Sequence, residues 1–285
     1  MTSTLTVDGR PTRPRRSARS TSGSSRRLTA TSGLGLGVAM IWFSLLVLIP
    51  LAAVVVKASG GGWSTFEHVL TNASTVRALR FTLLMAVLAT VLNAVMGTVI
   101  AWVLVRDRFP GKALLDLVID VPFALPTIVA GLVMLSLYGP GSPLGVNVYG
   151  TKPGVFLAIA FVTLPFVVRT VQPVLETLET DAEEAAASLG ASRFTTLRRI
   201  ILPSLAPAIF AGASLSFARA ISEYGSVVLL SGNKAGTAVA STRTYSYIEG
   251  GNTAAAAAIA VILLVVALVA IVVLDVLQRR MARRG

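Results

Sequence analysis

The stretch TAAAAAIAVILLVVALVAIVVLDVL, residues 253–277, is almost entirely apolar and decides the class of fold. At a rise of about 1.5 Å per residue, a helix of this length crosses the roughly 30 Å hydrocarbon core of a bilayer. Further apolar stretches of spanning length precede it, at 34–56, 79–105, 117–138, 155–174 and 205–230. The sequence therefore predicts an all-α polytopic membrane protein with six transmembrane helices.

The composition agrees with this prediction and excludes several classes of function. Of the 285 residues, 54% are hydrophobic and 13% are charged, whereas soluble domains average about 25% charged residues. The absence of cysteine excludes a disulfide framework, a thiolate metal site and a cysteine nucleophile. The single histidine, His68, argues against a histidine-rich metal site or a Ser-His-Asp triad. We expect no metal site and no catalytic residue.

The positive charges predict how the chain is oriented in the membrane. The segments 1–33, 106–116, 175–204 and 278–285 together hold 17 lysines and arginines, against 6 in or beside the other loops. Because short cytoplasmic loops are enriched in positive charge, both termini are expected in the cytoplasm.

Residues 1–33 and 34–285 form two regions of different composition. Residues 1–33 are rich in serine, threonine and arginine and show no apolar periodicity, so we expect a disordered, basic cytoplasmic tail. An arm that binds nucleic acid is the weaker interpretation. Residues 34–285 are expected to form one six-helix transmembrane domain.

Prolines inside the third and fourth predicted spans are expected to distort their helices. Pro122 and Pro126 lie in the third span and Pro165 lies in the fourth. Each proline removes a backbone donor and crowds the carbonyl four residues earlier, so kinked helices are expected. The hydroxyls of Thr127 and Thr163 could satisfy freed backbone groups. The kinks either border a transport path or only shape the packing.

The loop 179–203 predicts a first short helix that ends at a glycine. Thr180 and Glu183 have the spacing of a capping box, and the alanines 185–187 favour a helix with a thin face. Gly190 is placed to end this helix with a positive φ.

Ser192 is placed to start a second short helix, and Pro203 then marks entry to the fifth span. The loop is therefore expected to be a helical hairpin whose small alanines let the backbone of another protein approach. The alternative is an interfacial amphipathic hairpin that has no partner.

The same loop resembles a known family. It reproduces the EAA signature, E-A-A-x3-G-x9-I-x-L-P, at Glu184, Ala185, Ala186, Gly190, Ile200, Leu202 and Pro203. This signature is typical of the membrane-spanning permease subunits of bacterial ABC importers, which have the type I importer fold. The resemblance implies that the chain lies in a bacterial inner (plasma) membrane and that these residues couple it to a cytoplasmic dimer of ATPase subunits. ATP and Mg²⁺ would bind to that dimer, and this chain would bind no cofactor and have no enzyme activity.

The absence of a phosphate-binding loop agrees with this implication. The nearest string, Gly111-Lys112-Ala113, lacks the serine or threonine that should follow the lysine, and Arg106 stands where the first glycine belongs. The energy for any transport must therefore arrive through another chain.

Three further stretches resemble the T-type permeases of sulfate and thiosulfate importers. They are DVPFALPTIVAG at 120–131, FVTLPFVVR at 161–169 and FARAISEYGSV at 217–227. The resemblance implies a second permease subunit, either W-type or identical, an external sulfate-binding protein and membrane lipid as partners, and no nucleic acid. Molybdate or tungstate import is the main alternative, and the single Pro126-Thr127 pair favours sulfate.

Arg219 and Glu223 are four residues apart in the fifth span, so they share one helix face. Glu223 is the only acid expected deep within a span. The pair either holds this helix against a neighbour or lines the substrate path, together with Ser222, Ser226 and Thr127. A secondary anion transporter and a membrane anchor remain as other classes, but the sequence has no convincing internal repeat, and a kinked six-span chain exceeds what an anchor needs.

Overall fold

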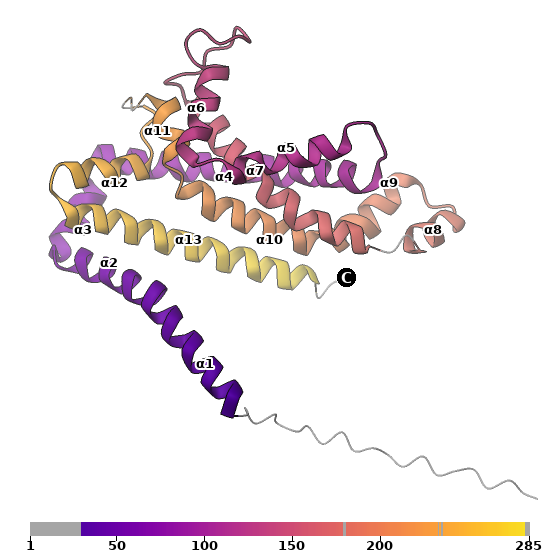
Figure 1. The fold of residues 1–285 in the computed structure, drawn as a ribbon, viewed down its shortest axis with the longest axis horizontal. Helices are drawn as coiled ribbons and strands as arrows, with labels where there is room; N and C mark the ends of the chain where they lie inside the picture. Colours follow the sequence, from indigo (N-terminus) through magenta and orange to yellow (C-terminus); the bar gives the residue numbers. More distant parts are fainter. Residues whose placement is uncertain (1–29, 179–180, 233, 235, 283–285) are drawn as a thin grey trace, which may run out of the picture. The chain divides into compact units, whose positions relative to one another are not determined.

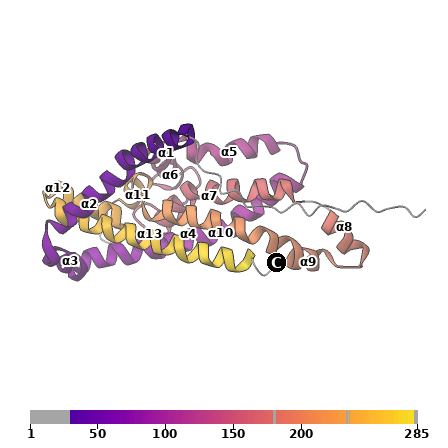
Figure 2. The same ribbon diagram turned by 90° about the horizontal axis from the view of Figure 1, so that it is seen from below.

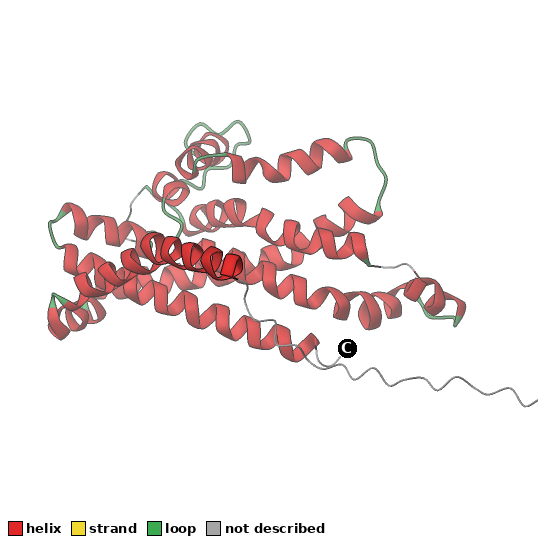
Figure 3. Cartoon of the chain, turned by 60° about the horizontal axis from the view of Figure 1, so that its bottom comes forward, coloured by secondary structure: helices red, strands yellow, loops and turns green. Residues whose placement is uncertain are grey.

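The computed structural model describes residues 30–178, 181–232, 234 and 236–282, and these residues form helices, turns and loops without a strand (Figure 3). The chain divides into two compact units, residues 1–49 and 50–285. In the first unit, α1 (Ala30–Phe43) is followed by the wide helical turn η1 (Ser44–Leu48). This helix begins four residues before the expected start at 34. The run Leu34–Ser59 is long and apolar enough to cross a membrane.

The second unit is a bundle of long helices. It contains α2 (Ile49–Ser59, from its second residue), α3 (Gly62–Thr71), α4 (Ala73–Arg106), α7 (Lys152–Thr177), α10 (Leu202–Ile221) and α13 (Thr253–Ala282). Helix α7 packs against both α4 and α10, and α10 also packs against α13 (Figures 1 and 2). Five described segments are long and apolar enough to cross a membrane, or six if the bent helix pair Lys112–Ala124 and Thr127–Tyr138 is counted as one span. The predicted all-α membrane fold is confirmed.

Small residues let the central helices approach closely. A Cβ atom added at Gly97 of α4 would lie 2.9 Å from the Cβ of Val167, and one added at Gly212 of α10 would lie 3.0 Å from the Cα of Val167. The buried amide of Asn93 in α4 donates to Thr163 Oγ1 at 2.8 Å, and Thr163 donates to the carbonyl of Ile159 at 2.8 Å. Close packing and hydrogen bonds between helices hold this core, as expected where lipid replaces water.

The third span is broken rather than kinked. It consists of α5 (Lys112–Ala124) and α6 (Thr127–Tyr138). The pair is bent by 119° at the break between them. Leu125 is extended, with ψ 134°, because the ring of Pro126 disfavours helical geometry in the residue before it. The expectation of one continuous helix over 117–138 is therefore wrong. Pro122 lies inside α5 and Pro165 lies inside α7, and both helices continue through them.

The fifth span also differs from the prediction at both ends. The helix begins at Arg193 with α9 (Arg193–Thr196), passes through the wide turn η2 (Leu197–Ile201) and continues as α10, which ends at Ile221. The expected separate second helix and the expected span 205–230 are therefore wrong. The helix is interrupted at residues 222–224. The next helix is α11 (Gly225–Ser231), which is followed by α12 (Ala240–Glu249).

Candidate functional site

A helical hairpin lies at the end of the bundle that is remote from α12 (Figures 1 and 2). Its first arm is α8 (Asp181–Ser188), and Gly190 follows with φ +79°. The amide of Ala191 donates to the carbonyl of Ala186 at 3.0 Å, and the amide of Gly190 donates to that of Ala187 at 2.9 Å. This pair of bonds is the Schellman motif. The predicted helix end at a positive-φ glycine is confirmed, whereas Thr180 of the predicted capping box lies outside the described residues.

The second arm begins as predicted and then joins the span. Ser192 caps it, since its Oγ accepts from the amide of Thr195 at 3.2 Å. The wide turn η2 then leads into α10: the amide of Leu202 bonds to the carbonyl of Leu197, and Ser204 Oγ donates to the carbonyl of Ile200 at 2.8 Å. The helix therefore passes through Pro203 without ending.

The hairpin presents small, apolar and acidic side chains on its surface. Leu189 and Phe194, on either side of the glycine, are 89% and 69% exposed. Of the signature residues, Glu184, Ala185, Gly190, Leu202 and Pro203 are exposed, Ile200 is half-buried and Ala186 is buried. A groove of about 960 Å³ lies between the arms and α4, and its lining includes Trp102, Glu184, Phe194 and Leu202.

An ion pair fixes the first arm to the end of α4. Arg106, the last residue of α4, donates from Nη2 to Glu183 Oε1 at 2.6 Å, and both side chains are half-buried. The guanidinium also lies 5.6 Å from the centre of the Trp102 ring, within the range of a cation–π contact. A movement of α8 would therefore be transmitted directly to α4, the longest helix of the bundle.

The two helix breaks lie side by side. A Cβ added at Gly225, the first residue of α11, would lie 2.7 Å from the amide nitrogen of Ile128 in the first turn of α6 and would collide with Thr127 Oγ1. A Cβ added at Gly131 would lie 2.7 Å from the Cα of Ser226. Two half-helices thus begin together inside the bundle, because glycine lets their backbones touch.

Glu223 organises this region from a buried position, at 2% exposure. Its Oε1 accepts from the amide of Ser226 at 2.9 Å and from the hydroxyl of Ser226 at 2.8 Å, so the carboxylate caps α11. Its Oε2 lies 2.6 Å from Nη1 of Arg219, whose side chain is 27% exposed. Ser241 Oγ donates to the carbonyl of Glu223 at 2.6 Å.

The structure thus separates the predicted path residues into two groups. Arg219 and Ser222 reach the surface of the second unit, and the Ser222 hydroxyl donates to the carbonyl of Arg219 at 3.0 Å. Glu223 and Ser226 are buried, and the half-buried Thr127 lies against Gly225. Arg219 lies two residues from the end of its helix rather than near the middle of a span.

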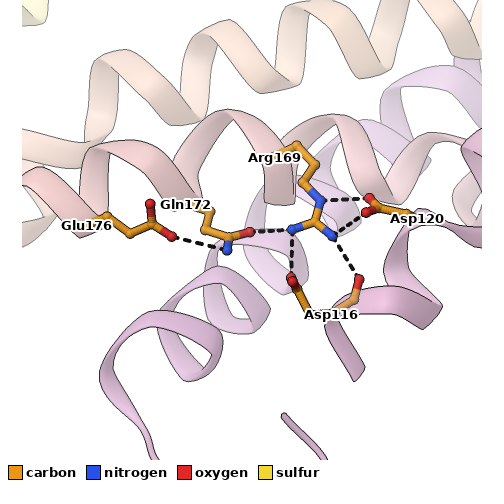
Figure 4. Close-up of polar contacts among 5 residues, drawn as sticks. All are labelled: Asp116, Asp120, Arg169, Gln172 and Glu176. Carbon is orange, nitrogen blue, oxygen red and sulfur yellow. Dashed lines mark hydrogen bonds and ion pairs between the residues drawn. The ribbon is translucent and has the colours of Figure 1, made fainter. Parts of the chain in front are cut away.

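A second charged cluster was missed by sequence reasoning. Arg169 of α7 binds Asp116 and Asp120 of α5, with Nε and Nη2 donating to the two carboxylate oxygens of Asp120 at 2.7 Å each (Figure 4). The available signal was the spacing of Asp116 and Asp120, which places two acids on one face of a helix.

The described residues contain no group of three or more His, Cys, Asp or Glu side chains that could hold a metal ion. Candidate functional features are therefore the hairpin, the paired helix breaks and the Arg169 cluster.

Fold and hairpin together define a permease of an import system, and the comparisons with known proteins agree. Residues 93–283 match the family described as "Binding-protein-dependent transport system inner membrane component", and the chain belongs to this family. Among its relatives is the sulfate transport system permease protein CysT of Salmonella typhimurium, 45% identical over 217 residues, which are 74% of this chain and 78% of the relative. The protein of the same name from Escherichia coli is 44% identical over 217 residues, with the same coverage.

Solved structures of ABC importers share the fold. A chain of a bacterial ABC transporter that imports the acidic polysaccharide alginate superposes with a TM-score of 0.73 at 18% identity, covering 87% of this chain and 94% of that one. A chain of the MetNI methionine ABC transporter has a TM-score of 0.58 at 17% identity, covering 72% and 95%. At these identities the likeness concerns the fold alone.

Proposed function

We propose that this chain is the permease subunit of an ATP-driven importer of sulfate and thiosulfate, and that it forms half of the translocation path. The main support for sulfate as the substrate is the 45% identity to a sulfate transport permease along 78% of that relative. This identity favours sulfate over the alternative, import of molybdate or tungstate.

The hairpin at 179–203 is the proposed docking element for a cytoplasmic ATPase dimer, which would bind ATP and Mg²⁺. Three exposed residues support this role. Glu184 offers a charge, Ala185 is small enough for another backbone to approach, and Leu189 offers an apolar anchor. The Schellman turn at Gly190 keeps the arms in a fixed geometry, which a docking element requires.

A complete path requires a second permease subunit, W-type or identical, which packs against this chain in the lipid bilayer, and an external sulfate-binding protein delivers the anion. In this arrangement the termini, with the basic residues 1–33, lie in the cytoplasm of a bacterial cell, in accord with the distribution of lysine and arginine. Nucleic acid has no part in it.

The paired helix breaks are the proposed gate region, with Arg219 and Ser222 as the residues that meet the anion. Glu223 offsets the charge of Arg219 and caps α11, so it keeps the attraction for a divalent anion modest. Modest attraction suits conduction, because an anion that is bound too tightly does not leave. Closure of the ATPases on ATP would draw the hairpins of the two permeases together and turn the path outward.

Competition during uptake tests the substrate assignment. The complete complex is reconstituted into liposomes with ATP inside and is supplied with radiolabelled sulfate. Excess thiosulfate should suppress the uptake of label, whereas molybdate and tungstate should leave it unchanged. Uptake of labelled molybdate in preference to sulfate would reject the assignment in favour of the alternative.

A further inference from the structure

The two arms of the broken third span have different supports. Helix α6 packs closely on α11, whereas α5 buries only Ile119 and Pro122 of its 13 residues. The side chains of Leu114 and Leu117 in α5 are 64% and 66% exposed. Among the described helices, α7 is the main packing partner of α5. The packing of α5 against the rest of the bundle therefore depends on few contacts, and polar contacts are important among them.

Arg169 supplies the charged contacts between α7 and α5. All three guanidinium nitrogens are used: Nε and Nη2 bind both oxygens of Asp120, and Nη1 binds Asp116 Oδ1 at 2.7 Å (Figure 4). In addition, Nη2 donates to the backbone carbonyl of Asp116 at 2.8 Å. Arg169 thus grips the main chain of α5 as well as its side chains. A planar guanidinium is suited to this geometry, and an ammonium group is not.

The cluster continues along α7 toward the hairpin. Arg169 Nη1 also donates to Gln172 Oε1 at 2.6 Å, and Gln172 Nε2 donates to Glu176 Oε1 at 3.3 Å (Figure 4). Glu176 is the residue before the end of α7 at Thr177, and α8 of the hairpin begins at Asp181. One chain of hydrogen bonds therefore joins α5 to the part of α7 that leads into the hairpin.

We propose that Arg169 is a positioning residue for transport: it ties α5 to the hairpin end of α7, so that α5 and the break at Leu125 and Pro126 follow the hairpin. This inference rests on the proposed function, in which the hairpin receives the ATPase. We call the hydrogen bonds from the Arg169 guanidinium to Asp116 and Asp120 the fork. The fork transmits a movement of α7 to α5 because it holds α5 by several directed bonds at once. Without the guanidinium, two carboxylates on one face of α5 would repel each other and leave α7.

Three variants separate this role from a general effect on stability. R169K keeps the positive charge but cannot form the fork. The triple variant R169Q/D116N/D120N removes the fork and leaves no charge unpaired, so it serves if R169K accumulates poorly. The matched control is R279K, which alters the exposed i,i+4 ion pair between Arg279 and Asp275 near the end of α13, at 2.8 Å.

The first measurement is the distance between spin labels on cysteines introduced at Leu114 of α5 and Thr177 of α7, both exposed, in a chain without native cysteine. We expect one narrow distance distribution for the unaltered fork and for R279K, and a broad one for R169K and for the triple variant. This measurement needs no substrate, so it remains valid if the anion is not sulfate. An unchanged distribution in both fork variants would overturn the proposal.

The second measurement compares transport with ATP hydrolysis in the complete complex. Loss of the fork should lower the number of anions imported per ATP by about tenfold, because hydrogen bonds to charged groups are worth at least that factor. ATPase binding and hydrolysis should persist. A purely structural role would lower the amount of folded protein but leave this ratio unchanged, and an unchanged ratio would contradict the proposal.

Discussion

Replacement of Gly190 by valine should damage the hairpin through the backbone alone. Gly190 has φ +79°, and nothing lies within 4 Å of the position that a Cβ would occupy. Steric collision therefore cannot account for any effect. A β-branched residue in the left-handed region is strained by about 1–3 kcal/mol. The two hydrogen bonds of the Schellman turn, from Gly190 and Ala191, would be given up to relieve that strain.

Asparagine at the same position is the matched control, because it tolerates the left-handed conformation far better than valine does. Both variants add a side chain in open space, so they differ mainly in the cost of a positive φ. We expect G190V to reach the membrane in normal amount, to lose most co-purifying ATPase and to import little sulfate. G190N should retain most of both properties.

Co-purification with the ATPase and uptake by reconstituted complexes are the assays, normalised to the amount of permease. Equal loss in G190V and G190N would show that any side chain at 190 blocks docking, and the argument from φ would then be wrong. Wild-type uptake by G190V would go further and remove the coupling role from the turn.

Three other predictions follow from the same structure. A single cysteine at Thr180 should react with an impermeant reagent only from the cytoplasm, and one at Ser64 only from outside; reversal of either result would reject the orientation. R219M should lower the yield of folded protein, since it leaves the buried carboxylate of Glu223 without its partner, at a cost of up to about 3–5 kcal/mol, and R219M/E223Q should recover it because glutamine still caps α11. If this double variant also imports sulfate normally, Arg219 has no role in the path. G225A should lower the melting temperature by overpacking the α6–α11 contact, at about 1–3 kcal/mol, and unchanged melting would show that the two half-helices are free to separate.

Much of the fold could be predicted from the sequence, because hydropathy over some 20 residues is a local property. The end of the first arm of the hairpin and the start of the second were equally accessible, since Gly190 and Ser192 bond to backbone groups only a few residues away. The break in the third span was harder to predict. The run over 117–138 is apolar on both sides of Pro126, and hydropathy does not distinguish a bend of 119° from a slight kink.

The interactions that cross the bundle could not be predicted in this way. Helix α10 ends where Glu223 turns to cap α11, and a carboxylate inside an apolar run gives no indication of which amide it will accept. Arg169 meets Asp120 from 49 residues away, and that pairing depends on how α5 folds back on α7. Periodicity assigns faces to helices, but it does not state which faces meet.

ATP-dependent uptake of sulfate is the measurement that tests the central claim most directly. The chain is reconstituted with its second permease, its ATPase and its sulfate-binding protein, and labelled sulfate is followed into vesicles loaded with ATP. Our account predicts uptake that requires ATP and the binding protein and is unaffected when ion gradients are dissipated. Uptake that persists without ATP and collapses with the ion gradient would identify a secondary transporter and contradict the account.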